Sequence, residues 1–227
     1  MLGRMQLSPE CARVLGALTE KGLATPQQYP LTVNALQSAC NQTSNREPVV
    51  SYDETTVLAA LDELTDRKLV RFVLPSHGRS VVRYRQVLDE TLALDARQCA
   101  VLAVLLLRGP QTIGELRIRT ERLATFDSLD EIDHELDLLH TREEPLADNI
   151  GRRPGQKEER WATTLVPAPA SAPDPATASD PAQPGTPPAA GPTAISSDDL
   201  RAELEELRAE VAEIRHEVHE LRESLGG

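Results

Sequence analysis

Residues 51–88, SYDETTVLAALDELTDRKLVRFVLPSHGRSVVRYRQVL, decide the fold because they join one amphipathic helix to one β-hairpin. Ser51 and Glu54 have the spacing of a capping box, which predicts that the helix begins there. The helix carries an apolar stripe formed by Val57, Leu61 and Leu64. Residues 69–74 and 80–86 alternate as strands around the turn sequence PSHG. The stretch therefore predicts a helix followed by an antiparallel hairpin.

Two further helices are predicted ahead of this stretch. Ser8 can cap the first, Pro9 suits its first position, and its apolar residues recur with helical spacing. These residues are Cys11, Val14, Leu15 and Leu18. Thr32 can start the second helix, which would run through Cys40. Three helices followed by a β-hairpin describe a winged helix, which we expect over residues 7–90.

The same order of elements recurs over residues 91–166. Three more helices each begin at a residue that can cap them, namely Asp95, Thr112 (in a capping box with Glu115) and Ser128. The last of them repeats the four-then-three apolar spacing, in Ile132, Leu136 and Leu139. Residues 146–150 and 158–166 are predicted to pair as a second hairpin. The expected fold class is mainly α with small β-hairpins (α+β), built as two tandem winged-helix domains.

Several features indicate the compartment. The three cysteines (Cys11, Cys40 and Cys99) lie far apart inside helical patterns, which favours buried reduced thiols over a disulfide or a metal site. The longest apolar run, residues 99–107, has nine residues, whereas spanning a bilayer takes about 20. The opening MLGRMQLSPE has no apolar segment of the signal-peptide type. We therefore expect a cytoplasmic protein that does not associate with membranes.

A linker is predicted over residues 167–195. Its first part, residues 167–192, holds nine prolines and no Leu, Ile, Val or aromatic residue, so we expect a disordered, extended Pro/Ala chain.

The net charge of −12 is unevenly distributed along the chain, with −4 in residues 1–166 and −6 in residues 193–227. Because much of the acidity belongs to the tail, the whole-chain charge does not exclude nucleic acid as a partner.

Residues 196–226 predict one long helix with a coiled-coil seam. Apolar residues are spaced four and three without a break, at Leu200, Leu204, Leu207, Val211, Ile214, Val218, Leu221 and Leu225. The g positions before the last are glutamates (Glu203, Glu210 and Glu217), and the e positions are arginines (Arg201, Arg208, Arg215 and Arg222). A parallel dimer places these opposite charges against each other, whereas an antiparallel dimer pairs like charges. The chain itself is therefore one expected partner, in a parallel coiled-coil homodimer.

Two segments resemble a known family. Residues 39–49, ACNQTSNREPV, and residues 105–117, which contain LLLRGPQT followed by GELR, strongly resemble the YceH-like family of bacterial proteins. The resemblance spans roughly residues 7–166. It implies a pair of winged-helix domains and supplies no reaction. The first segment runs into residues 41–50, which have no counterpart in the second copy and which we expect to form an ordered loop between helices.

The sequence does not favour an enzyme. It contains no Walker A motif, Rossmann fingerprint, GxSxG elbow or HExxH, so we expect no catalytic residue, metal or cofactor, and no small-molecule substrate is evident. The best catalytic candidate is the polar cluster of Asn41, Asn45, Arg46 and Glu47. A loop held by its own side-chain hydrogen bonds explains these residues equally well.

The first hairpin is the candidate nucleic-acid contact. Residues 67–88 hold six Arg or Lys and no acid. Strand alternation places Val70, Phe72 and Leu74 on a core-facing side, with Tyr84 opposite. The possible phosphate contacts project from the other face and the tip, and are Arg71, Arg79, Arg83 and Arg85. The alternative is a solvated face whose arginines pair with neighbouring acids.

The third helices carry the opposite charge. Residues 52–68 have a net charge of −3 and residues 129–141 a net charge of −5. Because groove binding depends on neutralising phosphates, such helices disfavour major-groove recognition.

The sequence leaves two hypotheses for the function. One is a DNA-associated regulator that holds the backbone of duplex DNA through the first wing. The other is a protein-interaction scaffold, resembling the winged-helix subunits of chromosome-condensing complexes, whose acidic third helices bind protein.

Overall fold

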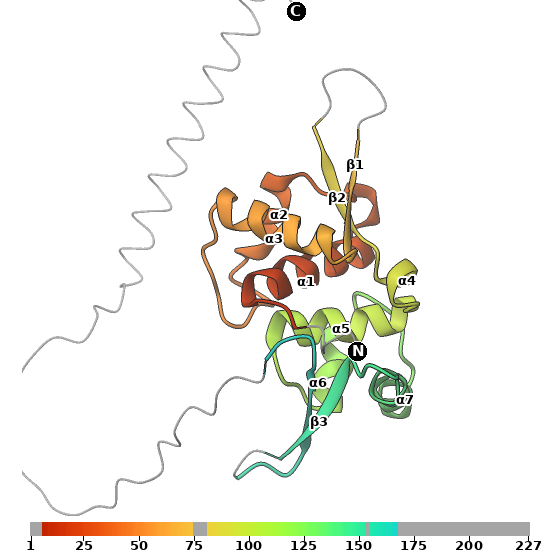
Figure 1. The fold of residues 1–227 in the computed structure, drawn as a ribbon. Coiled ribbons are helices and arrows are strands. Elements are labelled where there is room, and N and C mark those ends of the chain that lie inside the picture. The colour runs from red at the N-terminus through yellow and green to blue at the C-terminus, as the bar shows by residue number, and fades with distance from the viewer. Residues whose placement is uncertain (1–5, 75–80, 153–154, 168–227) are drawn as a thin grey trace, which may run out of the picture. The chain divides into compact units, whose positions relative to one another are not determined.

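The computed structural model describes residues 6–74, 81–152 and 155–167 (Figure 1). Apart from Pro167, the predicted Pro/Ala linker lies outside the described residues. So do the predicted coiled-coil helix and its eight core positions, and Arg79 of the first hairpin. The described chain is a mixed α+β fold, in which helices alternate with small antiparallel hairpins.

The first half contains three main helices and a hairpin. Its elements are α1 (Pro9–Ala24), η1 (Pro26–Gln28), α2 (Val33–Cys40), α3 (Glu54–Asp66), β1 (Val70–Val73), β2 (Arg83–Gln86) and α4 (Leu88–Thr91). The predicted caps of α1 and α2 are confirmed, because Ser8 accepts from the Cys11 amide at 3.1 Å and Thr32 from the Ala35 amide at 3.3 Å. The two strands pair antiparallel, with Phe72 opposite Tyr84.

The predicted start of α3 is wrong by two residues. Asp53, not Ser51, is the N-cap, and its carboxylate accepts from the Thr56 amide at 2.8 Å. The reason lies in the residue between them, since Tyr52 is held by the side chain of Asn41. Asn41 accepts from the Tyr52 amide and donates to the Tyr52 carbonyl, both at 2.8 Å. Tyr52 is thereby fixed outside the helix, so α3 begins after it.

The second half repeats the order of three helices and a hairpin. Its elements are α5 (Ala96–Arg108), α6 (Ile113–Thr120), α7 (Leu129–His140), β3 (Ala147–Arg152) and β4 (Glu159–Thr163). The predicted caps are confirmed at Asp95, Thr112 and Ser128. The predicted stripes of α3 and α7 are fully buried in both halves. Gly109 ends α5 with a φ of +69°, a conformation that suits glycine.

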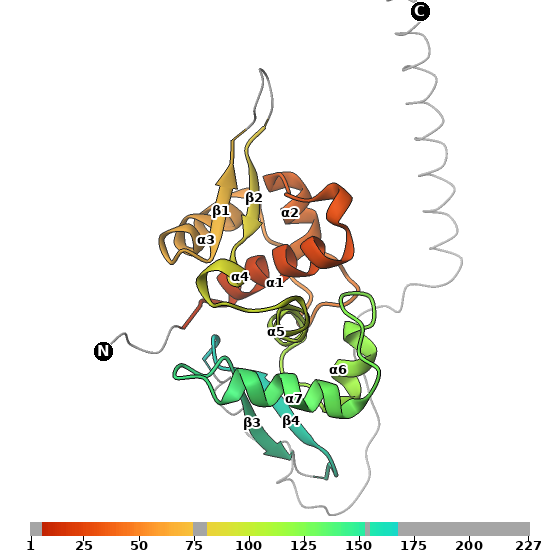
Figure 2. The same cartoon turned by 90° about the vertical axis from the view of Figure 1, so that its right-hand side faces the viewer.

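The two halves share one hydrophobic core. Helix α1 packs more extensively against α5 than against α2 or α3 of its own half, and Figure 2 shows α5 between α1 and the second hairpin. Gly16 makes this approach possible, because a Cβ there would lie 2.9 Å from Cγ of Leu107. The Leu7 amide also donates to the Leu165 carbonyl at 2.6 Å, which ties the two ends of the described chain together.

The cysteines are part of this core. Cys11, Cys40 and Cys99 are free thiols and are buried, as the sequence predicts. Burial raises the pKa of Cys11 to about 11 and the pKa values of Cys40 and Cys99 to about 12. Such thiols behave as small apolar side chains.

Candidate functional site

The first hairpin presents arginines on one face, as the strand alternation predicts. Arg71 lies opposite Arg85 in the register, and Arg83 lies two residues from Arg85 on the same side. Both Arg71 and Arg85 form ion pairs with Glu90 of α4, at 3.0 and 2.5 Å. The hydrogen bond from Arg85 is the main cause that holds the pKa of Glu90 below its usual range. Arg83 donates to the Pro30 carbonyl at 3.0 Å. One carboxylate thus lies against two arginines, and the face keeps a net positive charge.

The other face of the hairpin differs from the expectation. Val70 is buried, but Phe72 is 50% exposed and Leu74 is 68% exposed, so they do not face the core. The hairpin extends beyond the helices that could cover its outer part, as Figure 1 shows. Val81, which lies just before β2, is 64% exposed as well. The outer hairpin therefore combines arginines with exposed apolar side chains.

The third helices expose their acids. On α3, Glu54, Asp62 and Asp66 are exposed, and on α7, Asp130, Asp133 and Asp137 are exposed. Glu63 and Glu131 are half-buried, and Glu135 is buried, with no hydrogen-bond partner for its Oε2 among the described residues. Neither helix therefore presents a cationic surface to a DNA groove.

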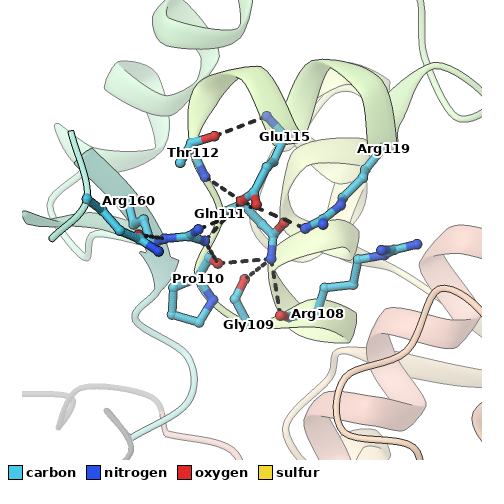
Figure 3. A network of polar contacts seen from close by, with 9 residues as sticks. Arg108, Gly109, Pro110, Gln111, Thr112, Glu115, Arg119 and Arg160 are labelled. Atoms are coloured by element: carbon cyan, nitrogen blue, oxygen red, sulfur yellow. Dashed lines mark hydrogen bonds and ion pairs between the residues drawn. The ribbon is translucent and has the colours of Figure 1, made fainter. Parts of the chain in front are cut away.

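Arg152 and Arg160 of the second hairpin both have partners within the chain. Arg160 donates to the Pro110 carbonyl and to Glu115, both at 2.9 Å (Figure 3). Glu115 also completes the predicted capping box with Thr112. Arg152 pairs with Glu159 at 3.6 Å. Glu158 and Glu159 also lie among the cations of this hairpin, whereas residues 67–88 hold no acid, so it is a weaker candidate than the first for binding phosphate.

The segment LLLRGPQT forms the turn between α5 and α6. The side-chain amide of Gln111 donates to three successive carbonyls, those of Arg108, Gly109 and Pro110, at 2.9–3.1 Å. The Gln111 backbone pairs with that of Trp161. Figure 3 shows the Gln111 side chain among these carbonyls, with Arg160 of β4 against Pro110. The residues of this motif therefore shape the joint between α5, α6 and the second hairpin.

The segment ACNQTSNREPV surrounds one buried arginine. The guanidinium of Arg46 donates to both carboxylate oxygens of Glu20, at 3.1 and 2.6 Å, and its side chain is fully inaccessible to solvent. It also donates to the Ala39 carbonyl at 3.0 Å and to the Gln42 side chain at 3.0 Å. The loop is ordered as predicted. The interpretation as a loop held by its own hydrogen bonds accounts for Asn41 and Arg46.

The two family-like segments meet in space. The Glu47 amide donates to the Leu107 carbonyl at 2.8 Å, and the Arg108 guanidinium donates to the Asn45 side chain. Arg108 and Asn45 are 63 residues apart, so sequence patterns give no sign of this contact. Glu20 lies 26 residues from its partner Arg46, so the sequence gives no sign of that pair either. Glu90 lies only five residues from Arg85, just outside the acid-free stretch of residues 67–88.

Metal-binding and membrane-spanning features are absent from the described residues. Within residues 6–74, 81–152 and 155–167, no three His, Cys, Asp or Glu side chains lie close enough together to hold a metal ion. No helix in the part of the chain that the structure describes is long and apolar enough to cross a membrane.

Comparison with known proteins identifies the family. A family model described as "Protein of unknown function, DUF480" matches residues 7–156. A UPF0502 protein of Koribacter versatilis is 48% identical over 161 residues, which cover 71% of this chain and 74% of the relative. A UPF0502 protein of Pelobacter propionicus is 50% identical over 154 residues, which cover 68% of this chain and 69% of the relative. The chain therefore belongs to the DUF480 family of bacterial proteins, with which the YceH-like character of its two motifs is compatible.

Proposed function

We propose that this is a non-enzymatic tandem winged-helix protein that contacts the backbone of duplex DNA through its first hairpin. The observation that carries the proposal is the common face of Arg71, Arg83 and Arg85 on β1 and β2. Winged helices use their hairpin on the DNA backbone or minor groove. The repeated order of three helices and a hairpin supports the winged-helix assignment of both halves.

Backbone contact fits the charges better than base recognition. The exposed acids of α3 and α7 would be repelled by the phosphates that line the major groove. Arginines that bind phosphate position a protein on DNA without reading its sequence. The proposed activity is therefore duplex binding with little sequence preference and a strong dependence on salt.

Replacing Arg71, Arg83 and Arg85 together with glutamine is expected to weaken DNA binding equally on all sequences. The slope of log K against log salt should flatten by roughly 0.9 for each phosphate that the variant no longer neutralises. Fluorescence anisotropy on random duplexes at several salt concentrations measures both quantities. Arg152→Gln on the second hairpin is the matched control and should leave the slope unchanged. Absence of binding by the unmodified protein at about 50 mM salt would contradict the proposal.

A second candidate function is protein scaffolding, which the exposed apolar residues of the same hairpin favour. Phe72, Leu74 and Val81 would suit the apolar side chains of a partner segment, and the arginines on the opposite face of the same hairpin would suit acidic ones. Phe72→Ser separates the two functions. It should abolish capture of a protein partner and leave salt-dependent DNA binding intact, whereas the arginine variants should reduce DNA binding.

The acidic tail supports a proposal about assembly. We propose that residues 196–226 form a parallel coiled-coil homodimer, on the strength of the unbroken apolar spacing and the opposite charges at e and g. The full chain should scatter light as a dimer at micromolar concentration, and a chain that ends at Val166 as a monomer. A full-length monomer, or a dimer that survives the truncation, would refute the proposal. Cysteines placed at Asp199 should cross-link, which tests the parallel direction.

A further inference from the structure

A cleft of about 400 Å³ lies where the two halves of the described chain meet. Its walls come from α1, from the loop of residues 42–45, and from α5 and α6 with the turn that follows α6. Four cationic side chains line it, namely Lys21, Arg108, Arg119 and Arg122. One acid, Glu20, also lines it. Because small-molecule sites occupy about 300–1,000 Å³, the cleft has the size of a ligand site.

The acid in the cleft forms its hydrogen bonds with a cation outside the lining. Both oxygens of Glu20 accept hydrogen bonds from the buried guanidinium of Arg46, which itself does not line the cleft. Glu20 therefore balances the charge of Arg46. The four cations of the lining are left in excess.

The four cations have few partners of their own. Neither Lys21 nor Arg122 forms an ion pair with any residue that the structure describes. Arg119 approaches Glu115 only to 3.9 Å, and Glu115 is engaged more closely by Arg160, at 2.9 Å. Arg108 donates to the neutral amide of Asn45.

Arg108 is repelled by neighbouring cations. Burial lowers the pKa of Arg108, the nearby charges of Arg119 and Arg46 lower it further, and Glu20 and Glu47 act in the opposite direction without cancelling this shift. Figure 3 places Arg108 and Arg119 on the side of the polar network away from Arg160. An anion bound here would relieve this repulsion, and guanidinium groups bind phosphate through paired hydrogen bonds.

The rest of the lining is partly apolar. Val104, Leu107 and Leu123 form one part of it, and Ile118, which is 74% exposed, lies at its edge. Ser44 and Gln42 add polar groups that can bond a ligand. Among the residues that the structure describes, no aromatic side chain belongs to the lining, so this lining offers no surface for stacking a base. The lining suits a small organic phosphate whose uncharged part contacts aliphatic side chains.

We propose that this cleft binds a small organic phosphate, held by Arg108, Arg119, Arg122 and Lys21 between the two halves of the chain. The sequence shows no small-molecule site because the four cations come from three separate segments. The ligand would contact both halves at once. The proposal does not depend on DNA binding by the first hairpin.

Isothermal titration calorimetry of the full chain tests the proposal with pyrophosphate, glycerol 3-phosphate and glycerol. Pyrophosphate and glycerol 3-phosphate should bind, and glycerol, which lacks the phosphate, should not. The double variant Arg119→Gln, Arg122→Gln should lose at least tenfold in affinity for both phosphates. Arg152→Gln removes one charge from the same half outside the cleft and should bind as the unmodified protein does.

An NMR titration of the unmodified chain with pyrophosphate tests the location of the site without relying on the variants. Pyrophosphate should shift the backbone resonances of Ser44, Asn45 and Arg119 in the unmodified chain, and leave those of Arg83 and Arg85 in place. Failure of both phosphates to bind at low salt would overturn the proposal. So would unchanged affinity in a folded double variant. If only duplex DNA binding falls in that variant, the cleft is part of a DNA surface and the small-ligand proposal is wrong.

Discussion

Replacing Arg46 with alanine is expected to lower the free energy of unfolding by about 3–5 kcal/mol, the usual cost of removing one partner of a buried ion pair. The Arg46 side chain is fully inaccessible to solvent, and that of Glu20 is 16% exposed. The variant would leave the Glu20 carboxylate without its partner. It would also leave the Ala39 carbonyl without the donor that Arg46 supplies. Urea denaturation followed by circular dichroism measures the change.

The matched control for this prediction is Arg67→Ala. Arg67 pairs with Glu63 at 2.9 Å on the exposed side of α3, where both side chains are more than one-third exposed. Its loss should cost about 0.3–0.5 kcal/mol, as for other exposed pairs on helices. A similar small loss for Arg46→Ala would show that the buried pair does not organise the loop. Replacing Arg46 and Glu20 together with methionine should destabilise the chain less than Arg46→Ala alone, because no buried charge is then left unpaired.

Gly16→Val is expected to destabilise the protein by about 1–3 kcal/mol through overpacking. A Cβ at this position would lie 2.9 Å from Leu107 Cγ and 3.0 Å from Leu106 Cβ. Cβ of Leu106 is bonded to the backbone of α5, so it cannot move away without shifting the helix. The variant would push α1 and α5 apart, and thermal unfolding followed by circular dichroism should show a lower midpoint.

Gly114→Ala is the matched control, with the opposite sign. A Cβ at Gly114 would meet only the Thr112 hydroxyl, at 3.9 Å, within the first turn of α6. Alanine should therefore stabilise that helix by up to about 1 kcal/mol, because it restricts the unfolded chain more than glycine does. If Gly16→Val also raised the unfolding midpoint, the close packing of α1 on α5 would not hold in solution.

Local signals in the sequence were the reliable ones. The caps at Ser8, Thr32, Asp95 and Thr112 depend on residues within one turn of each helix, so their spacing predicts them directly. The prediction that Ser51 caps α3 is wrong, although the spacing of Ser51 and Glu54 fits a capping box. The side chain of Asn41, which lies outside the helix, fixes Tyr52 between Ser51 and Asp53. Such a contact does not produce a periodic pattern in the sequence.

Non-local contacts explain what the sequence did not predict in the candidate site. Alternation correctly assigned Phe72 to the face opposite Arg71, but it could not show how far the hairpin extends past the helices that cover it. The sequence also did not predict the partners of Arg46 and Arg108. Arg46 meets Glu20 from 26 residues away, and Arg108 meets Asn45 from 63 residues away. The cleft exists only once these segments are folded together.

The reactivity of the three buried thiols measures how often the helices that carry them open. At pH 8 roughly one Cys40 side chain in ten thousand is a thiolate, given a pKa raised to about 12, and alkylating reagents attack the thiolate. In the unfolded chain the same thiols would react at ordinary rates. Cys11 lies in α1, Cys40 in α2 and Cys99 in α5, so each thiol samples a different helix. Mass spectrometry of partly alkylated protein would therefore show whether these helices open together or one at a time.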